Sequence, residues 1–508
     1  MINFHPEKTD RDNITAEQLA AHNRCANYIR DKLGNAGIET FEVVSSVTGE
    51  KSIVGIIGEI NDLLGDALIF DCHYDVKDVE GRKAEENFDS DLVFIGERFS
   101  GLTQNKIFNL SERGIAKVYR GAGSCDMLGS SAALLATVDA IKDSQKNNSN
   151  SCIFIFAPDE EFGAHHGTEL AVQELYNRYT NLQRKTSEGK VHTLIMEPTY
   201  LAYNRCHRGQ IVMDVKLPSI PPSDLQGFDY QDFSSITMHP GYFDKNSESN
   251  KPVLKQVLDY LEENEGKIFP IDLFVGDKKG DEIVISNPNA IPTCARLYFT
   301  NDKSSIREET SRLIDFLKKY WDLNFIVPKK FPRSKFATEG ISYGINIKRG
   351  EDGWMVFLNI RMFYENENEI KEKLEEIVKY CEGNITRFRW VKPLHTPQPI
   401  PLLQKLVSHG KRHWPVAQNL FSDNYDKATS EEEFLGGTVA RWYKQKGVNN
   451  IVIWGPLGFL LHAKGEFVFV QSIDYMALVL QDLLESHLRK QYVLPLLPKR
   501  HDATDQSL

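Results

Sequence analysis

The chain has 508 residues, of which 41% are hydrophobic and 26% are charged, and its formal net charge is −11. At about 150 residues per domain this length predicts two to four domains, and the composition excludes a wholly disordered chain. The acidic balance argues against general nucleic-acid binding, which favours a basic stripe. No stretch approaches the roughly 18 apolar residues of a membrane span, and the first residues lack a signal-peptide pattern. We therefore expect a soluble, cytoplasmic protein with no membrane partner.

The first predicted element is a helix. Thr15 and Gln18 have the spacing of a capping box, and the helical pattern runs to Leu33, where Gly34 should end it. Short apolar runs bounded by polar loops follow, and such continuous runs are typical of buried parallel strands. They cover 53–57, 67–70, 152–157, 192–196 and 450–454. Helical patterns lie between them, so the sequence predicts an α/β fold with a doubly wound, mainly parallel sheet and helices on both faces.

A smaller domain is predicted inside the larger one. Proline clusters at 218–222 and 393–401 interrupt the α/β pattern. Between them lie amphipathic helical patterns at 253–261, 313–321 and 370–378 and an alternating strand pattern at 355–362. We place an α+β lid or dimerisation domain at 208–395, inserted into a catalytic domain formed by 1–207 and 396–508. The sheet should resume after the insert and end in a helix capped by Ser472. We predict no element in the long polar stretch 79–116.

Metal-binding residue types follow the ends of the predicted strands. Ligands of open α/β sheets bind beyond the carboxyl ends of the strands, so these side chains should meet at one edge. They are His73 and Asp75, Glu160 and Glu161, Glu197, and His462. Asp126 lies in a glycine-rich turn that leads into a helix at Ser130. Imidazole nitrogens and carboxylate oxygens in one set suit zinc, cobalt or manganese better than magnesium or an iron–sulfur cluster.

At these residues the sequence resembles the di-zinc metallopeptidase and deacylase family that includes acetylornithine deacetylase, succinyl-diaminopimelate desuccinylase, carboxypeptidase G, aminoacylase and the carnosinase-type dipeptidases. Seven motifs match in chain order. They are H-x-D-V at 73–76, G-x-G-x-x-D-M-K-G at 121–129, D-E-E-x-G at 159–163, E-P-T at 197–199, R-G at 208–209, G-G-T-D-A from 436 and H-A-x-x-E at 462–466. Leu128 stands where the family usually has lysine, and Val439 replaces the aspartate of G-G-T-D-A. Neither position is a metal ligand.

The resemblance implies two divalent metal ions, zinc first, with cobalt or manganese as alternatives. One ion would be held by His73 and Glu197 and the other by Glu161 and His462, with Asp126 bridging both. Two metals about 3.5–4 Å apart lower the pKa of a shared water to near neutrality and polarise a carbonyl.

The resemblance also implies the residues that work around the metals. Glu160 would be the general base, which takes the proton of the water and delivers it to the leaving amine. Asp75 would accept the second ring N–H of His73 and so orient it. In the insert, His239 resembles the lid histidine that reaches the substrate oxyanion. Asn346 and Arg361 resemble the pair that holds the substrate carboxylate. The matched G-G-T motif implies substrate contacts by Gly437 and Thr438.

The resemblance therefore implies a hydrolase that cleaves an amide bond in a small, carboxylate-bearing substrate. An N-acyl amino acid and a short peptide are both compatible, so a deacylase and a dipeptidase or carboxypeptidase-type exopeptidase stay open. The alternative of another class is a catalytically silent binding protein that keeps the fold. A lid as long as 208–395 can supply contacts that otherwise come from a second subunit, so both a monomer and a homodimer stay open.

Overall fold

The computed structural model divides into two compact units. The main unit comprises the described residues of Asn13–Ala202, Gln398–Ser430 and Trp442–Leu508, and the insert unit those of Tyr203–Pro397 and Glu431–Arg441. The residues that the structure describes are 14–76, 89–94, 115–141, 150–162, 164–207, 209–218, 234–238, 253–279, 282–284, 294–301, 308–323, 341–350, 353–362, 367–396, 399–418, 425, 438–459 and 466–488.

The main unit is built on a mainly parallel sheet. Its described strands are β1 (Glu39–Val44), β2 (Lys51–Ile57), β3 (Ala67–His73), β6 (Ser151–Ala157), β7 (Val191–Ile195) and β18 (Asn450–Ile453). They lie in the order β1-β2-β6-β3-β7-β18. β3 pairs in parallel with β6 and β7, and β7 with β18, whereas β2 is antiparallel to both β1 and β6. The parallel direction predicted for 53–57 is therefore wrong, because a continuous apolar run reports burial of both faces and not strand direction.

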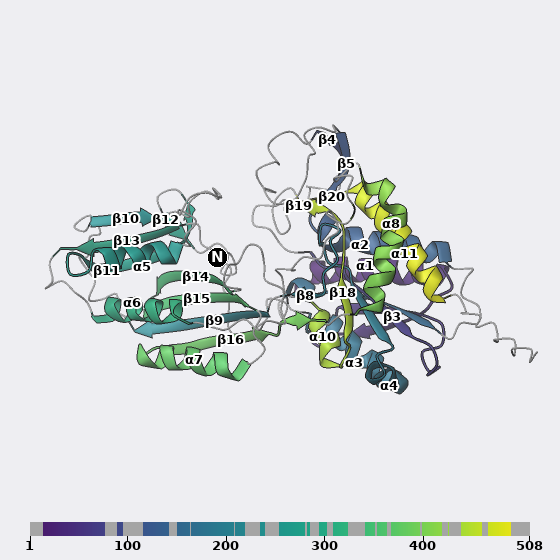
Figure 1. Ribbon diagram of the computed structural model, residues 1–508, viewed down its shortest axis with the longest axis horizontal. Helices are drawn as coiled ribbons and strands as arrows, with labels where there is room; N and C mark the ends of the chain where they lie inside the picture. The colour runs from purple at the N-terminus through teal and green to yellow at the C-terminus, as the bar shows by residue number, and fades with distance from the viewer. Residues whose placement is uncertain are drawn as a thin grey trace, which may run out of the picture. The chain divides into compact units, whose positions relative to one another are not determined.

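Helices cover both faces of this sheet, as predicted. They are α1 (Ala16–Asn35), α2 (Gly129–Ile141), α3 (Thr168–Arg178), α4 (Thr180–Ser187), α8 (Pro401–Ala417), α10 (Ala440–Gln445) and α11 (Val470–Leu488). Successive residues of β3 point to opposite faces: Asp71 accepts the hydroxyl of Tyr443 of α10, whereas Cys72 lies close to Ser131 of α2. α2 also packs against α1 and α11 (Figure 1). Among the described helices, none is long and apolar enough to cross a membrane.

Helix ends depart from the prediction in two places. α1 begins with the predicted capping box, in which Gln18 N donates to Thr15 Oγ1 and Thr15 N donates to Gln18 Oε1. It runs to Asn35, so Gly34 does not end it. Ser472 lies inside α11, and its hydroxyl donates to the carbonyl of Phe469 instead of capping the helix. Single glycine and serine residues are tolerated in helices when packing or a back-bond compensates for their low helix propensity.

A second, smaller sheet in the main unit was not predicted. Among the described residues it contains β4 (Asp89–Phe94), β5 (Ile115–Arg120), β19 (Gly458–Phe459) and β20 (Phe467–Phe469), in the order β19-β20-β5-β4. All its pairings are antiparallel. β4 falls within the polar stretch 79–116, where no element was predicted. The β20–β5 pairing brings a C-terminal segment beside the glycine-rich turn that follows β5.

The insert unit is α+β. Its described strands are β9 (Gly209–Pro218), β10 (Ser234–Met238), β11 (Phe269–Lys279), β12 (Glu282–Val284), β13 (Cys294–Thr300), β14 (Ile341–Gly350), β15 (Gly353–Met362) and β16 (Asn384–Val391). They form an antiparallel sheet in the order β10-β13-β11-β14-β15-β9-β16, and β12 pairs with β11. The predicted helices are confirmed as α5 (Val253–Glu263), α6 (Glu308–Trp321) and α7 (Glu367–Tyr380). The short strands β8 (Cys206–His207) and β17 (Leu394–His395) pair with each other.

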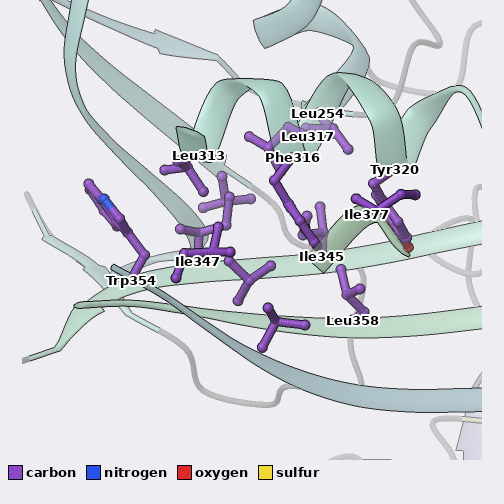
Figure 2. Packing of buried hydrophobic residues seen from close by; sticks show 14 of the residues in the cluster. Leu254, Leu313, Phe316, Leu317, Tyr320, Ile345, Ile347, Trp354, Leu358 and Ile377 are labelled. Carbon is purple, nitrogen blue, oxygen red and sulfur yellow. The ribbon is translucent and has the colours of Figure 1, made fainter. Parts of the chain in front are cut away.

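The core of the insert unit lies between its helices and one face of its sheet. Figure 2 shows Phe316 of α6 directed at Ile345 of β14, and Leu317 and Leu358 belong to the same cluster. On β15 every second residue from Trp354 to Ile360 joins this core, which is the period of two expected of a strand with one face on helices. The insert unit therefore has a hydrophobic core of its own. Full burial of each large side chain contributes about 1.5–3 kcal/mol to the free energy of folding.

Candidate active site

Three parallel strands of the main unit end in chemistry-bearing residues. His73 is the last residue of β3, and Glu197 follows β7 by two residues. Glu160 and Glu161 form a short 3₁₀ turn, Glu160–Phe162, that follows β6. Because β6, β3 and β7 are parallel neighbours, their carboxyl ends lie at the same edge of the sheet. This is the edge at which open α/β sheets bind their ligands.

His73, Asp126 and Glu197 converge on one point. Each offers a ligand atom, and the three atoms lie within 4.8 Å of one another. The Nε2 of His73 lies 3.2 Å from Oδ1 of Asp126. All three residues are buried, the most exposed being Asp126 at 8%. Residues separated by more than 120 positions in the sequence therefore form one buried, mostly acidic cluster.

The cluster holds more negative than positive charge, and the pKa values show it. Burial raises the pKa of Glu197 well above its usual range, and repulsion by Glu160 and Asp126 adds to this. Burial also raises the pKa of Glu160 to about 7, with Glu161 among the neighbours that add to the shift. For His73, burial alone would lower the pKa, but hydrogen bonds to carboxylates raise it well above its usual value. Perturbation of this kind in a group of facing carboxylates marks a candidate functional site.

Asp75 joins His73 to the turn after β6. Its Oδ1 lies 3.2 Å from Nδ1 of His73, the contact predicted for a residue that orients the ring. The same carboxylate also accepts the backbone N–H of Glu160 on Oδ1, at 3.1 Å, and that of Glu161 on Oδ2, at 3.2 Å. Asp75 is fully buried. One side chain therefore fixes both the imidazole and the turn that carries the predicted base.

The donor set fits divalent metal ions. One imidazole nitrogen and several carboxylate oxygens are ligands that zinc, cobalt and manganese accept. In the described part of the chain, Oε1 of Glu197 is buried and accepts no hydrogen bond. A buried carboxylate oxygen is ordinarily satisfied by a donor or a cation, so this atom is suited to metal ligation.

The other predicted site residues are placed differently. Glu161 adjoins Glu160 but is not one of the three residues that converge. In the insert unit, Asn346 is buried on β14, and Arg361 on β15 is in register with Ser342 and Gln210. Buried Thr438 accepts the backbone N–H of Ala440 at the start of α10, which is a structural contact. The remaining three, His239, Gly437 and His462, lie outside the described residues.

The family follows from a comparison with known proteins. A sequence model of peptidase family M20/M25/M40 matches residues 87–486, well over half of the chain. The chain belongs to this family. It is therefore a metallopeptidase-type hydrolase that acts on amide bonds, which agrees with the predicted resemblance. Asp126, Glu160 and Glu197 lie inside the matched range, whereas His73 precedes it and converges with Asp126 and Glu197 in the structure.

Solved structures share the fold of this M20 peptidase at low sequence identity. The aminoacylhistidine dipeptidase of Vibrio alginolyticus is 12% identical, with 93% of each chain covered and a TM-score of 0.54. A tripeptidase of Staphylococcus aureus is 11% identical, with 92% of this chain and 93% of that chain covered and a TM-score of 0.50. These likenesses support the fold alone. A comparison with curated protein sequences gave no match.

Residues that were not predicted hold the strand ends of this M20 peptidase in place. At the start of α2, the hydroxyl of Ser130 donates to the carbonyl of Met196 at 2.6 Å, and that of Ser131 donates to the carbonyl of His73 at 3.3 Å. Each carbonyl belongs to a candidate ligand or to the residue before one. The signal available in the sequence was the pair of serines directly after the turn that carries Asp126.

Two further contacts lie beneath and beside the cluster. Thr199 accepts the backbone N–H of Gly455 at 3.1 Å, and a Cβ on Gly455 would meet the carbonyl of Glu197 at 2.1 Å, so only glycine fits there. Two residues before His73, the buried carboxylate of Asp71 accepts the hydroxyl of Tyr443. Burial raises the pKa of Asp71 to about 7. The Gly-Pro loop after β18 is thus packed directly against the backbone of a candidate ligand.

Proposed function

We propose that this M20 peptidase is a di-metal exopeptidase that cleaves one amide bond of a short, carboxylate-bearing peptide. The observation that carries the proposal is the buried convergence of His73, Asp126 and Glu197 at the carboxyl edge of the sheet. Such a cluster is costly to bury unless cations balance it. Membership in a peptidase family supports the same reaction and disfavours the alternative of a catalytically silent binding protein.

The metal ligands proposed are His73 and Glu197 for one ion and Glu161 and His462 for the other, with Asp126 bridging. Zinc is the proposed metal, and cobalt or manganese would suit the same nitrogen and oxygen donors. Two bound divalent ions would supply an activated water near neutral pH and polarise the scissile carbonyl. The positive charge would also favour the ionised forms of the buried carboxylates, whose pKa values are raised by burial and mutual repulsion.

Glu160 is the proposed general base. It takes a proton from the attacking water and passes it to the leaving amine, which is the task of a carboxylate beside the reacting atoms. Its position supports this role, because it adjoins Glu161 in the turn after β6 and its backbone is held by Asp75. Two N–H bonds to one buried carboxylate limit the movement of that turn. Asp75 therefore acts as a positioning residue for the base and for His73.

Substrate selection is assigned to the insert unit. We propose that Asn346 and Arg361 bind the substrate carboxylate, that His239 reaches the oxyanion, and that Gly437 and Thr438 also bind the substrate. A guanidinium that meets a carboxylate in bidentate fashion fixes the orientation of a small substrate. Of the two substrate classes we propose a short peptide, because the matching family is described as a peptidase family. Two structures of similar fold are named as a dipeptidase and a tripeptidase, and we propose a substrate of that size for this chain.

The direct test of the mechanism is Glu160→Gln. The substitution removes a proton acceptor but no proposed ligand, so bound metal should stay at the wild-type level while kcat falls by about 10²–10⁴-fold. Metal content is measured by elemental analysis of the purified variant, and kcat by release of amino acids from a dipeptide. His165→Gln serves as the control, since His165 is an exposed neighbour that bonds Glu169 and should leave both readouts unchanged. Wild-type kcat in Glu160→Gln would show that another group is the base.

A further inference from the structure

The Glu466 carboxylate accepts hydrogen bonds from the turn that carries Asp126. It lies directly before β20 and is 2% exposed. Its Oε1 accepts the backbone N–H groups of Cys125 at 3.0 Å and Asp126 at 3.1 Å, and its Oε2 accepts that of Gly123 at 3.0 Å. In the described part of the chain no cationic side chain forms an ion pair with Glu466. Its charge is therefore balanced there by three backbone donors of a single turn.

Strand pairing places this carboxylate. β20 is antiparallel to β5, with Phe467 opposite Arg120, so the residue before β20 lies beside the residue after β5. There the N–H of Gly121 donates to the carbonyl of Glu466 at 3.0 Å. Gly123 has a φ of 72°, the left-handed conformation that glycine adopts without strain. Such a residue turns neighbouring N–H groups to one side and forms a concave site for an anion, which Glu466 fills.

The turn bound by Glu466 determines where Asp126, a proposed metal ligand, lies. The Asp126 carboxylate is 3.2 Å from Nε2 of His73, and its own backbone N–H is one of the three that Glu466 accepts. A bridging carboxylate must be held within about 0.5 Å of its productive position to serve two ions. A carboxylate suits this position because both of its oxygens accept hydrogen bonds and neither donates one. An amide would present its N–H groups to one of the backbone donors.

We propose that Glu466 is a positioning residue of the metal centre: by accepting the N–H groups of the turn it holds the Asp126 carboxylate beside His73 and so sets the affinity for metal. This inference rests on the proposed function, in which Asp126 bridges two ions. Residues that orient metal ligands typically change metal affinity by 10–100-fold when they are replaced. The role differs from simple stabilisation, because it predicts a loss that appears in metal binding and is rescued by added metal.

The test is zinc affinity in Glu466→Gln. The amide has nearly the same shape, but it loses one acceptor and sets an N–H donor against a backbone N–H. We expect zinc to bind at least about tenfold more weakly, measured by competition with a chromophoric chelator after metal removal. kcat at low zinc should fall and recover as zinc is added, while KM stays at the wild-type value. Glu466→Asp keeps the charge but has a shorter side chain, so its zinc affinity should lie between those of the wild-type protein and Glu466→Gln. If the glutamine variant did not fold, the zinc affinity of Glu466→Asp would serve as the test.

Glu50→Gln is the matched control. Glu50 is a fully buried carboxylate of the same unit that bonds His22 at 2.5 Å and belongs neither to the turn nor to the cluster. Its replacement should lower the stability of the metal-free protein without weakening zinc binding. Wild-type zinc affinity in Glu466→Gln, or an equal loss in Glu50→Gln, would overturn the inference and leave the proposed function standing. A wild-type protein that binds no zinc, cobalt or manganese would overturn both.

Discussion

Asp75 shows how much one buried carboxylate can organise. It contacts Nδ1 of His73 and accepts the backbone N–H groups of Glu160 and Glu161. The first contact could be predicted, because Asp75 is two residues from His73 in a recognisable motif. The second depends on the parallel pairing of β3 with β6, which brings the two loops together. The residue types of the cluster could therefore be predicted, but the hydrogen bonds that join Asp75 to the turn after β6 could not.

His487 gives a pH dependence that belongs to a single residue. It is 2% exposed, and its Nε2 lies 3.1 Å from the carbonyl of Ser151, at the amino end of β6. Burial, with repulsion by Lys405, lowers its pKa from 6.5 to about 4. The folded state therefore keeps the ring neutral, and the unfolded state binds the extra proton between these pH values. Stability from this residue is complete above pH 6.5 and is lost as the pH falls toward 4.

The prediction is tested with His487→Gln, which can donate an N–H to the same carbonyl but does not titrate. Between pH 7.5 and pH 5 the wild-type protein should lose about 2 kcal/mol more unfolding free energy than the variant. Urea unfolding at both pH values measures this double difference, in which other titrating groups cancel. Equal losses in the two proteins would show that His487 is not held neutral.

Contacts between residues that are far apart in the sequence could not be predicted. His73, Asp126 and Glu197 could be singled out because each follows a recognisable strand or turn signal. Glu466 meets Asp126 across 340 positions, and Tyr443 meets Asp71 across 372. No local pattern reports such contacts, since they depend on which strands and helices become neighbours.

At the scale of elements, the helix signals were informative because they are local. The capping box of α1 and the helical patterns of α5, α6 and α7 depend on residues three or four positions apart. Strand direction is not local. The apolar run in β2 predicted a buried strand, and burial is what the structure shows, but its antiparallel partners β1 and β6 are set by the tertiary fold. β4 was not predicted because it lies in a polar stretch and pairs with β5 in the smaller sheet.

The cap of α1 yields a test at the element scale. Thr15 Oγ1 accepts the N–H of Gln18 at 3.1 Å, so Thr15→Ala leaves a helix donor without its partner. The change should lower the free energy of unfolding by about 1 kcal/mol, as measured by urea denaturation. Thr15→Ser retains the hydroxyl and should keep most of the wild-type stability. A serine variant as unstable as the alanine variant would indicate that the methyl group, and not the cap, stabilises α1.

For the whole molecule, the chain divides into two compact units. The described candidate ligands, the base and Glu466 all lie in the main unit, whereas Asn346, Arg361 and Thr438 lie in the insert unit. The boundaries expected from the proline clusters, 208 and 395, fall within the span Tyr203–Pro397 of the insert unit, which also takes in Glu431–Arg441. This last segment could not be predicted, because it returns to the insert unit from a distant part of the chain. We propose that metal chemistry belongs to one unit and substrate selection to the other.

The most direct test of di-metal catalysis measures the metal content of the purified chain and its rate of dipeptide hydrolysis, before chelation, after chelation and after zinc is restored. We expect about two divalent ions per chain, loss of hydrolysis with loss of metal, and recovery with zinc. N-acetylated amino acids in the same assay should be cleaved more slowly than dipeptides. Full dipeptide hydrolysis by protein that has been shown to hold no metal would rule out a metal-dependent mechanism.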